Sequence, residues 1–384
     1  MSWSPEQVAL MSATAEFVRR EVGPHLQEWE DTAAIPRSLH LAAAKAGLLG
    51  ISFPEEVGGQ GGTLLDSVAM QEAFFAAGGS SGLAAGLFTG GIALPHMAAH
   101  GTPEQIEAFV RPTLAGEKIG SLGVTEPGGG SDVAGIRTTA VRDGDHFIVN
   151  GAKTFITSGV RADFVTTAVR TGGPGHAGIS LLVVERGTPG FTVDRALTKM
   201  GWHCSDTAEL SYTDVRVPVE NLVGEENAGF YLIAEQFVVE RIALAVHAYG
   251  IAARSLALTA SYCRERETFG KPLISRQVVQ HKLVEMHRQI EAARVYTRHV
   301  AERYVGGVPA DQQSIIAEAC LAKQTAVEAC DHVVDQAVQL HGGAGYMHGT
   351  EVERHYRDSR ILGIGGGSTE VLTDLAARLL GFAS

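Results

Sequence analysis

The spacing of apolar positions changes twice along the chain. Up to about residue 118 apolar residues recur at intervals of three and four, as in PEQVALMSATAEFVRREV, which is typical of amphipathic helices. Between about 120 and 224 the apolar runs become short and β-branched, as in DHFIVNGAKTFIT and GISLLVVER, and Gly, Asp and Pro bound them. From 225 onward long helical stretches return, and these pack best as an antiparallel bundle. The pattern predicts an α+β chain with a helical domain (1–119), a β domain (120–224) and a second helical domain (225–384).

Composition and charge narrow the class of partner. The formal net charge of −12 argues against nucleic acid or an anionic membrane as the main partner, because either requires a basic surface. A local site for a phosphate-bearing ligand stays open. The four cysteines form no CxxC pair and the histidines give no HExxH spacing, so neither a disulfide framework nor a metal site is predicted. The N-terminal residues lack the basic start and apolar run of a signal peptide. We expect a cytoplasmic protein.

Two glycine-rich segments indicate ligand contacts. GSLGVTEPGGGSDVAG (120–135) lies where the helical region gives way to the β domain, and its glycines let backbone N–H groups approach a ligand. ILGIGGGSTEVLTDL (361–375) has a glycine loop with Ser368 or Thr369 as the N-cap of a helix, a place that suits a phosphate or another electron-rich group. It does not fit the dinucleotide pattern GxGxxG, because Ser368 stands at the third glycine and no βαβ unit follows.

The ordered string TEPGGGSD is more specific than its glycines alone, and the sequence that carries it resembles the acyl-CoA dehydrogenase family of flavoproteins over essentially its whole length. Four further segments match in order: KTFITSG (153–159), KMGWHCSDTAEL (199–210), RETFGKPL (266–273) and QLHGGAGYMHGTEVERHYRDSRILGI (339–364). The resemblance implies an N-terminal α-helical domain, a middle β-barrel or sandwich domain and a C-terminal four-helix bundle. It also implies FAD held between the last two domains and across a subunit boundary, in a homotetramer built as a dimer of dimers.

The resemblance assigns individual residues to the cofactor. Thr125 corresponds to a hydroxyl that meets the flavin ring, Ser131 lines the groove for FAD and CoA, and Thr157 lies near flavin N5. Phe155 stands where the family commonly has a Trp that shields one flavin face, a departure that keeps a flat apolar wall. Arg266 matches a residue that reaches the FAD pyrophosphate of a neighbouring subunit, as suits a bidentate cation. The other implied cofactor contacts are Leu122, Val124, Thr268, Phe269, Gln277, Gln339, Gly342, Gly343, Ser368 and Glu370.

The implied reaction converts an acyl-CoA thioester to the trans-2-enoyl-CoA: a base removes the α proton while a hydride leaves the β carbon for flavin N5. Many members carry the base as the Glu of an EGT string before the last helix, but here residues 366–368 read GGS. A branch that includes isovaleryl- and long-chain-type enzymes carries it on a bundle helix, immediately before an Arg. Glu240-Arg241 resembles that pair, and the 25 residues from Arg241 to Arg266 agree with the family spacing. Glu240 is the predicted base, and Arg241 a cation that orients it or contacts CoA.

Gly366 keeps one role in this scheme, because its N–H can bond the thioester carbonyl together with a ribityl hydroxyl of the flavin. Glu370 is the weaker alternative base, since the family uses its position towards the adenine. An isolated Glu-Arg pair on a helix is most often a solvated ion pair, so the assignment of Glu240 depends on the motif register. Two alternatives stay open: an enzyme that acts on a carrier-protein thioester or uses O₂, and a non-catalytic relative that binds flavin or acyl-CoA.

The resemblance further implies a role in fatty acid metabolism, within β-oxidation, with an electron-transfer flavoprotein as electron acceptor. The acyl chain length is not fixed by the motifs. Gly90 and Gly91, in GLFTGGIALP (86–95), lie near the expected end of the acyl pocket. They leave room for a long or branched chain, or they only let helices approach each other.

Overall fold

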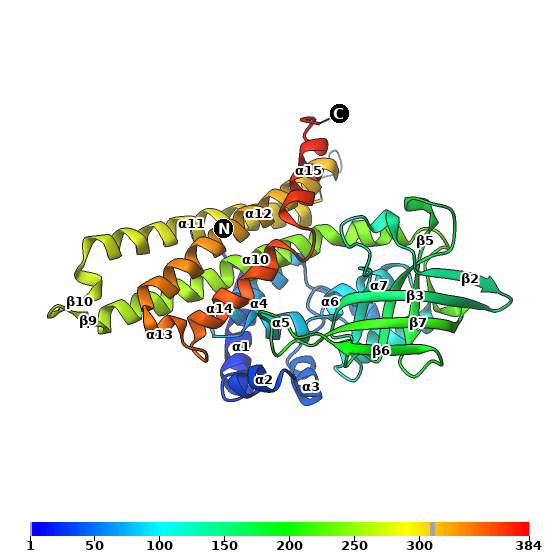
Figure 1. The fold of residues 1–384 in the computed structure, drawn as a ribbon, viewed down its shortest axis with the longest axis horizontal. Coiled ribbons are helices and arrows are strands. Elements are labelled where there is room, and N and C mark those ends of the chain that lie inside the picture. The colour runs from blue at the N-terminus through cyan, green and yellow to red at the C-terminus, as the bar shows by residue number, and fades with distance from the viewer. Residues whose placement is uncertain (1, 308–311, 384) are drawn as a thin grey trace.

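The computed structural model describes residues 2–307 and 312–383, and its elements fall into a helical, a β and a second helical group along the chain (Figure 1). The first helix begins at a capping box, in which the Ser4 hydroxyl accepts a hydrogen bond from the N–H of Gln7 and Pro5 occupies the first turn. The helices of this group are α1 (Pro5–Phe17), α2 (Leu26–Thr32), α3 (Arg37–Lys45), α4 (Leu64–Ala76), α5 (Ser81–Leu87), α6 (Gly90–Ala93), α7 (Pro95–His100), α8 (Pro103–Gln105) and α9 (Arg111–Leu114).

The β group is one eight-stranded sheet with the order β6-β7-β3-β2-β4-β5-β8, and β1 pairs in parallel with β4. Its strands are β1 (Gly120–Gly123), β2 (Thr139–Asp143), β3 (His146–Thr157), β4 (Phe164–Arg170), β5 (Ile179–Glu185), β6 (Phe191–Ala196), β7 (Thr207–Pro218) and β8 (Leu222–Val223). Alternation along β4 sends Phe164 and Ala168 into a core shared with the helices, and Val165 and Val169 into a core of the sheet's own residues. A sheet that encloses its own core agrees with the predicted barrel or sandwich.

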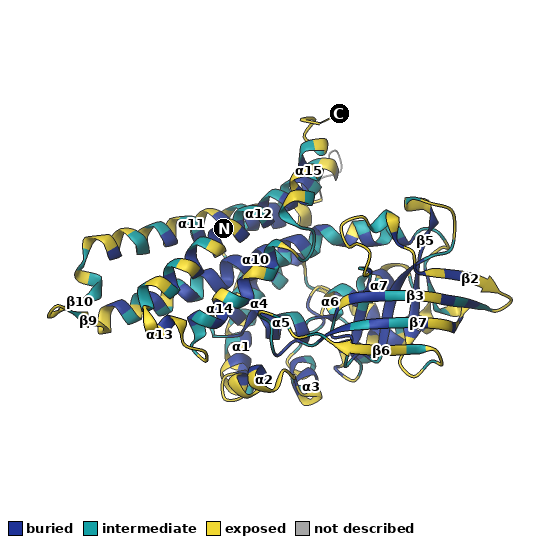
Figure 2. Ribbon diagram, viewed as in Figure 1, coloured by how far each residue is buried: buried dark blue, intermediate teal, exposed yellow. Residues whose placement is uncertain are grey.

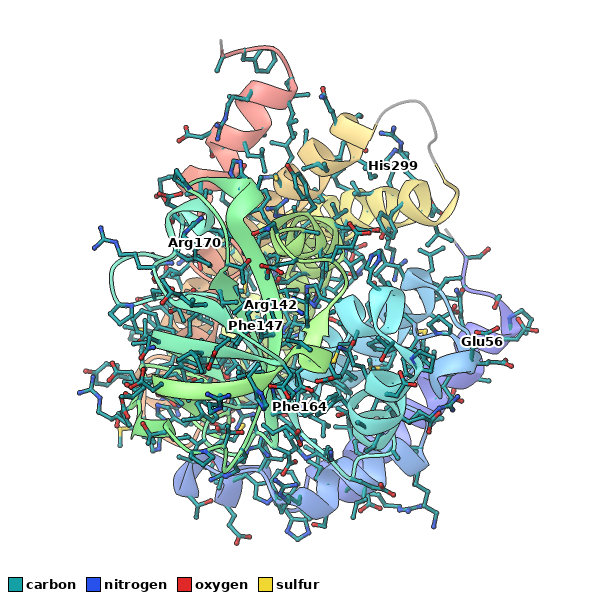
Figure 3. All side chains as sticks on the ribbon, turned by 90° about the vertical axis from the view of Figure 1, so that its right-hand side faces the viewer. Glu56, Arg142, Phe147, Phe164, Arg170 and His299 are labelled. Atoms are coloured by element: carbon teal, nitrogen blue, oxygen red, sulfur yellow. The ribbon has the colours of Figure 1, made fainter. Side chains whose placement is uncertain are left out.

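Two arginines of this sheet, Arg142 and Arg170, are labelled in Figure 3. The guanidinium of Arg142 lies over the ring of Phe147, 5.7 Å from the centroid. Arg170, at the end of β4, donates hydrogen bonds to the carbonyls of Ala134 and Ile136, at the end of the glycine-rich segment 120–135 and just after it. The chain that leaves this loop is therefore tied to the sheet.

The C-terminal group is a helical bundle of α10 (Gly229–Glu265), α11 (Gln277–Val305), α12 (Gln312–His341) and α15 (Thr369–Leu379), with the short helices α13 (Gly343–Tyr346) and α14 (Glu351–Ser359) between the last two. Tyr262 near the end of α10 stacks on His341 at the end of α12, with 4.3 Å between ring centroids, so these two helices run in the same direction. The hairpin of β9 (Glu267–Thr268) and β10 (Lys271–Pro272) joins α10 to α11.

Helix α10 connects the two ends of the molecule. At 37 residues it is about 55 Å long, and it runs from the sheet to the β9–β10 hairpin (Figure 1). By length and composition alone, α10 could cross a membrane. However, 61% of its most apolar 18-residue stretch is buried inside the protein, as Figure 2 illustrates. This burial is typical of the core helix of a bundle. The four cysteines are free and buried.

Candidate active site

Glu240 lies in the first half of α10 and is partly buried, whereas Ile242 and Ala245 on the same helix are fully buried. Burial raises the pKa of the Glu240 carboxyl above its usual value, and the positive charges of Lys323 and Arg241 oppose that rise. The carboxylate is therefore not the solvated surface group that an isolated Glu on a helix would be.

Arg241, the next residue on α10, is 7% exposed. Its guanidinium lies over the ring of Phe237, 5.4 Å from the centroid, one helical turn earlier. Among the described residues its Nε has no hydrogen-bond partner. A buried donor that is left without an acceptor costs free energy, so Arg241 is suited to receive an acceptor atom from a ligand.

Lys323 on α12 belongs to this site although the sequence did not single it out. Its side chain is 1% exposed, and its ammonium donates hydrogen bonds to the carbonyls of Gly365 and, at 2.7 Å, of Gly367. Burial lowers the pKa of Lys323 to about 8, while the carboxylate of Glu240 raises it. The two helices thus bring opposite charges to the glycine loop before α15.

Gly366 sits where these two charges meet. A Cβ built on it would lie 3.3 Å from Oε1 of Glu240, 3.7 Å from Nζ of Lys323 and 2.3 Å from Cδ1 of Leu244. Its φ of +65° is a left-handed conformation that favours glycine. A side chain at 366 would collide with Leu244 on α10. The carboxylate of Glu240 lies next to the space that such a side chain would fill. Within the described chain the N–H of Gly366 donates no hydrogen bond.

The glycine loop after β1 lies across β3. The N–H of Thr154 donates to the carbonyl of Thr125 (2.9 Å), and the Lys153 ammonium donates to the carbonyl of Val124 (3.0 Å). Thr125, Val124 and Leu122 are partly buried, and Ser131 is exposed. A Cβ on Gly128 or Gly129 would meet nothing within 4 Å, so this part of the loop is open.

An ion pair fixes this loop. Glu126 is 8% exposed, and its carboxylate accepts hydrogen bonds from the Lys153 ammonium (2.9 Å) and from the N–H groups of Arg137 (2.7 Å) and Thr138 (2.8 Å). Burial opposes ionisation, but Lys153 and Thr138 hold the pKa of Glu126 below its usual value. Burial lowers the pKa of Lys153 to about 8. With every oxygen of the carboxylate bonded, the backbone around Thr125 is held in one conformation.

Phe155 presents its ring to solvent. Its side chain is 68% exposed, and its φ of +60° is a genuine outlier for a bulky residue. Such backbone costs roughly 1–3 kcal/mol and persists where the surrounding structure imposes it, most often at functional sites. An exposed flat ring at this position is accessible to a ligand, and its contact with a flavin stays a prediction.

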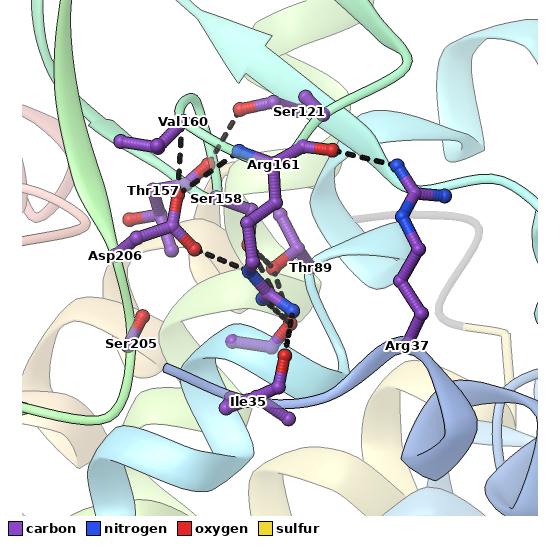
Figure 4. Close-up of polar contacts among 12 residues, drawn as sticks. Ile35, Arg37, Thr89, Ser121, Thr157, Ser158, Val160, Arg161, Ser205 and Asp206 are labelled. Carbon is purple, nitrogen blue, oxygen red and sulfur yellow. Dashed lines mark hydrogen bonds and ion pairs between the residues drawn. The ribbon is translucent and has the colours of Figure 1, made fainter. Parts of the chain in front are cut away.

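A polar network behind Thr157 joins the sheet to the N-terminal helices (Figure 4). The Ser121 hydroxyl donates to the carbonyl of Thr157 (2.5 Å), and Ser158 shares a hydrogen bond with Thr89 (2.7 Å). Arg161 pairs with Asp206 and donates to the carbonyl of Ile35 (3.0 Å). The end of β3 that carries the predicted flavin contacts is therefore anchored to both domains.

The remaining predicted cofactor residues lie at the far end of the bundle, around the β9–β10 hairpin and α13 (Figure 1). Arg266 follows α10 directly, 26 residues after Glu240, which along a helix corresponds to about 39 Å. The Phe269 ring is 98% exposed, and its φ of +52° is again left-handed. The others are exposed or partly buried at the same end: Thr268, Gln277, Gln339, Gly342 and Gly343. A single chain does not bring this group to Glu240.

Ser368 is the N-cap of α15, because its hydroxyl accepts a hydrogen bond from the N–H of Val371 (3.4 Å). This decides between the two caps predicted from the sequence. Glu370 in the first turn is exposed, and hydrogen bonds from its own backbone and Ser368 hold its pKa below the usual value. A solvated, more acidic carboxyl is a weaker base than Glu240.

The histidines do not form a metal site. Among residues 2–307 and 312–383, no group of three or more His, Cys, Asp or Glu side chains could hold an ion. His96 is 3% exposed, and neither of its ring nitrogens has a hydrogen-bond partner among the described residues. Burial lowers its pKa to about 4, so the ring is neutral at pH 7.

Comparisons with known proteins agree over the whole chain. The sequence matches the acyl-CoA dehydrogenase N-terminal domain over residues 4–117, the middle domain over 121–215 and the C-terminal domain over 227–381. It is 38% identical over 381 residues to the mitochondrial long-chain specific acyl-CoA dehydrogenase of Rattus norvegicus, covering 98% of this chain and 86% of that protein. It is 35% identical to the isobutyryl-CoA dehydrogenase of Bos taurus, covering 99% and 90%. A crystal structure from Mycobacterium smegmatis, assigned as an acyl-CoA dehydrogenase, is 60% identical with a TM-score of 0.97, covering 100% and 99%. The chain belongs to the acyl-CoA dehydrogenase family of FAD-dependent oxidoreductases.

Proposed function

We propose that Glu240 is the base with which this acyl-CoA dehydrogenase removes the α proton of an acyl-CoA. The observation that carries the proposal is the 3.3 Å between Oε1 of Glu240 and a Cβ built on Gly366. Gly366 is the position at which many family members carry their base, so the carboxylate of this chain reaches the same region from another helix. The missing carboxylate at 366 was the argument for a non-catalytic relative. Because Glu240 supplies a carboxylate in the same region, that argument no longer holds.

The residues of this chain have separate roles in the proposed reaction. The carboxylate of Glu240 takes the proton, which requires that it be ionised, and the charges of Lys323 and Arg241 favour the ionised form. The N–H of Gly366 donates to the thioester oxygen as negative charge develops there. Bound FAD supplies the acceptor for the hydride that leaves the β carbon.

The residues present suit FAD. The exposed Phe155 ring and the open glycines 128–129 are accessible to a flat ring system and its ribityl chain, and the partly buried Thr125 and Thr157 supply hydroxyls. Arg266, whose side chain is exposed at the end of α10, supplies a cation for a pyrophosphate.

We infer that each cofactor site is completed by a second copy of the chain, in a homotetramer built as a dimer of dimers. The support is the length of α10, which separates Arg266 from Glu240 by about 39 Å along the helix, further than one dinucleotide reaches when it is also stacked on Phe155. The exposed apolar side chains at the far end, Phe269, Tyr346 and Met347, supply surface for a subunit contact.

The acyl chain is proposed to extend toward Gly90 and Gly91. Gln236, one turn before Glu240 on α10, donates a hydrogen bond to the carbonyl of Gly91 (3.0 Å). A Cβ on Gly91 would meet nothing within 4 Å, and Phe88, Gly90 and Gly91 line a small open pocket. This arrangement favours a long or branched acyl chain, in fatty acid metabolism.

An electron-transfer flavoprotein is the proposed acceptor, β-oxidation the proposed pathway and the cytoplasm the proposed location. Four free thiols suit a reducing compartment. Reduction of an electron-transfer flavoprotein, measured against oxygen uptake, separates this acceptor from O₂. A carrier-protein thioester tested beside the acyl-CoA separates the two substrate classes.

The decisive experiment is Glu240→Gln, which keeps the shape of the side chain but cannot take the proton. FAD content should be unchanged, and bleaching of the flavin by an acyl-CoA should slow by at least about 100-fold. Glu235→Gln is the matched control, since Glu235 lies on the same helix with a side chain that is 70% exposed. Near-normal bleaching in Glu240→Gln would remove Glu240 from the mechanism.

A further inference from the structure

Lys323 occupies a place where a lysine is costly. Its neighbours three and four positions away on α12, Ala319, Cys320, Ala326 and Val327, are all buried, and Lys323 itself is 1% exposed. Burying an ammonium is unfavourable unless hydrogen bonds and an opposite charge compensate for lost water. The backbone carbonyls of the glycine loop supply the hydrogen bonds, and the opposite charge comes from Glu240.

The two carbonyls that Lys323 binds belong to Gly365 and Gly367, on either side of Gly366. Gly366 and Gly367 both have left-handed backbone, with φ of +65° and +96°. Two successive left-handed residues turn the loop sharply, and the turn brings both carbonyl oxygens onto one ammonium. Because glycine has the most backbone freedom to lose, this turn depends on an external anchor, and Lys323 is that anchor.

The same ammonium lies close to the predicted base. Oε1 of Glu240 and Nζ of Lys323 lie 3.3 and 3.7 Å from the Cβ position of Gly366, so both charged groups border the same point of the loop. The other charged or titratable groups that act on this pair are Arg241 on α10 and Cys320 on α12. Of the two cations, Lys323 opposes the effect of burial on the Glu240 carboxyl more than Arg241 does. The guanidinium of Arg241 lies over the ring of Phe237.

We propose that Lys323 is a positioning residue for the dehydrogenation, which holds Gly366 against Glu240 through the carbonyls of Gly365 and Gly367 and keeps the Glu240 carboxylate ionised. This rests on the proposed function of Glu240. The Lys323 side chain then has two effects on removal of the α proton. It positions the backbone N–H that donates to the thioester oxygen, and it favours the ionised form of the base.

The test uses three substitutions in the FAD-loaded enzyme. Lys323→Met removes the charge and both hydrogen bonds at similar volume, and Lys323→Arg keeps the charge. Gln324→Met is the matched control, because Gln324 is the next residue on α12 and donates to Thr369 and Thr373 of α15 rather than to the loop. Two readouts are measured: the pH dependence of flavin bleaching by an acyl-CoA, and hydrogen exchange of the amides in 363–368 in the enzyme without substrate.

In Lys323→Met the base needs a higher pH to ionise, so the acid limb of the pH profile should move upward by about one unit or more, the effect of losing a close opposite charge. Amide exchange in 363–368 should accelerate at least tenfold. In Lys323→Arg the acid limb should stay within about 0.3 pH units of the wild type, since the charge remains. Gln324→Met should change neither readout in this loop.

An unmoved acid limb and unchanged exchange in Lys323→Met would overturn the proposal, as would an Arg variant shifted as far as the Met variant. If Lys323→Met does not fold, Lys323→Gln carries the same expectations, and the Arg variant still decides the role of charge. The outcome for Glu240→Gln separates the two proposals. If that variant bleaches normally, the proposed base fails, whereas a dead Glu240→Gln with an unaffected Lys323→Met refutes only the role of Lys323.

Discussion

Phe155 and Phe269 share a left-handed backbone and an exposed ring, although the sheet that carries Phe155 and the β9–β10 hairpin that carries Phe269 lie at opposite ends of the molecule. Within the chain the ring of Phe269 has the guanidinium of Arg276 over it, 5.8 Å from the centroid, and Phe269 is still 98% exposed. Both properties are explained when a ring contacts something outside the chain: a flavin at Phe155, and a second subunit with its cofactor at Phe269. Strain retained at two exposed positions therefore indicates two functional surfaces.

Phe269→Asn should weaken FAD retention without weakening the fold of the chain. Asn accepts left-handed backbone more readily than Phe, and the lost ring is 98% exposed, so the free energy of unfolding of the FAD-free chain should stay equal or rise by up to about 1 kcal/mol. Denaturant unfolding of FAD-free protein, with FAD content and sedimentation measured in parallel, checks this. A variant that retains FAD and its native assembly would show that the ring makes no contact between subunits.

Gly366→Ala should lower kcat/KM by about tenfold or more while FAD content stays normal. The new methyl group would lie 2.3 Å from Leu244, and Ala in left-handed backbone costs about 1–2 kcal/mol, so the loop must move away from Glu240. Gly365→Ala is the control, because a Cβ there meets nothing closer than 3.6 Å and its backbone is not left-handed. Equal effects of the two substitutions would show that the position of Gly366 is not special.

Gly91→Leu should shift the preference toward short acyl chains. The side chain enters space in which a Cβ meets no atom within 4 Å, so the fold should tolerate it, while the space left for the end of a long chain shrinks. Flavin bleaching by acyl-CoAs of increasing length measures the change, and Gly91→Ala should give an intermediate shift. An unaltered profile in Gly91→Leu would place the acyl chain elsewhere.

Asp358→Asn should flatten the pH dependence of stability. Asp358 on α14 is fully buried; burial and the nearby carboxylate of Glu30 raise its pKa to about 7, while the N–H of Trp202 donates to it (2.6 Å). A pKa raised in the folded state stabilises the protein at low pH, and that stabilisation is lost as the pH rises from about 4 through 7. Over this range the wild type should lose more than about 1 kcal/mol relative to the variant, measured by denaturant unfolding. Parallel curves for the two proteins would contradict this.

The sequence predicted the order of helical and β regions, because periodicity reports which side of each element is buried. It predicted Glu240 because a charged pair interrupts an apolar helix in the register of a known motif. Lys323 was missed, since nothing in the spacing places a loop that lies more than forty residues later against its ammonium. A signal existed: Lys323 falls between Ala319 and Ala326, on the apolar side of its helix. Lys153 could have been found in the same way, because alternation along β3 turns it inward with Phe147 and Val149.

What the sequence could not supply is distance. The resemblance assigned Arg266 to the FAD of a neighbouring subunit, but the motifs alone give no distance between residues. The fold places the sheet that carries Phe155 and the β9–β10 hairpin beside Arg266 at opposite ends of α10. The length of this helix gives the two groups a physical separation that the motif order does not contain.

The span of α10 also has a genetic consequence. In the proposed assembly each catalytic centre draws its base from one polypeptide and its pyrophosphate anchor from another. Consider an assembly that pairs a chain lacking Glu240 with a chain lacking Arg266. One catalytic centre then carries both mutations, and the other centre carries neither. Co-expression of two individually inactive alleles would restore a fraction of intact centres, so the two mutations would complement each other within one gene.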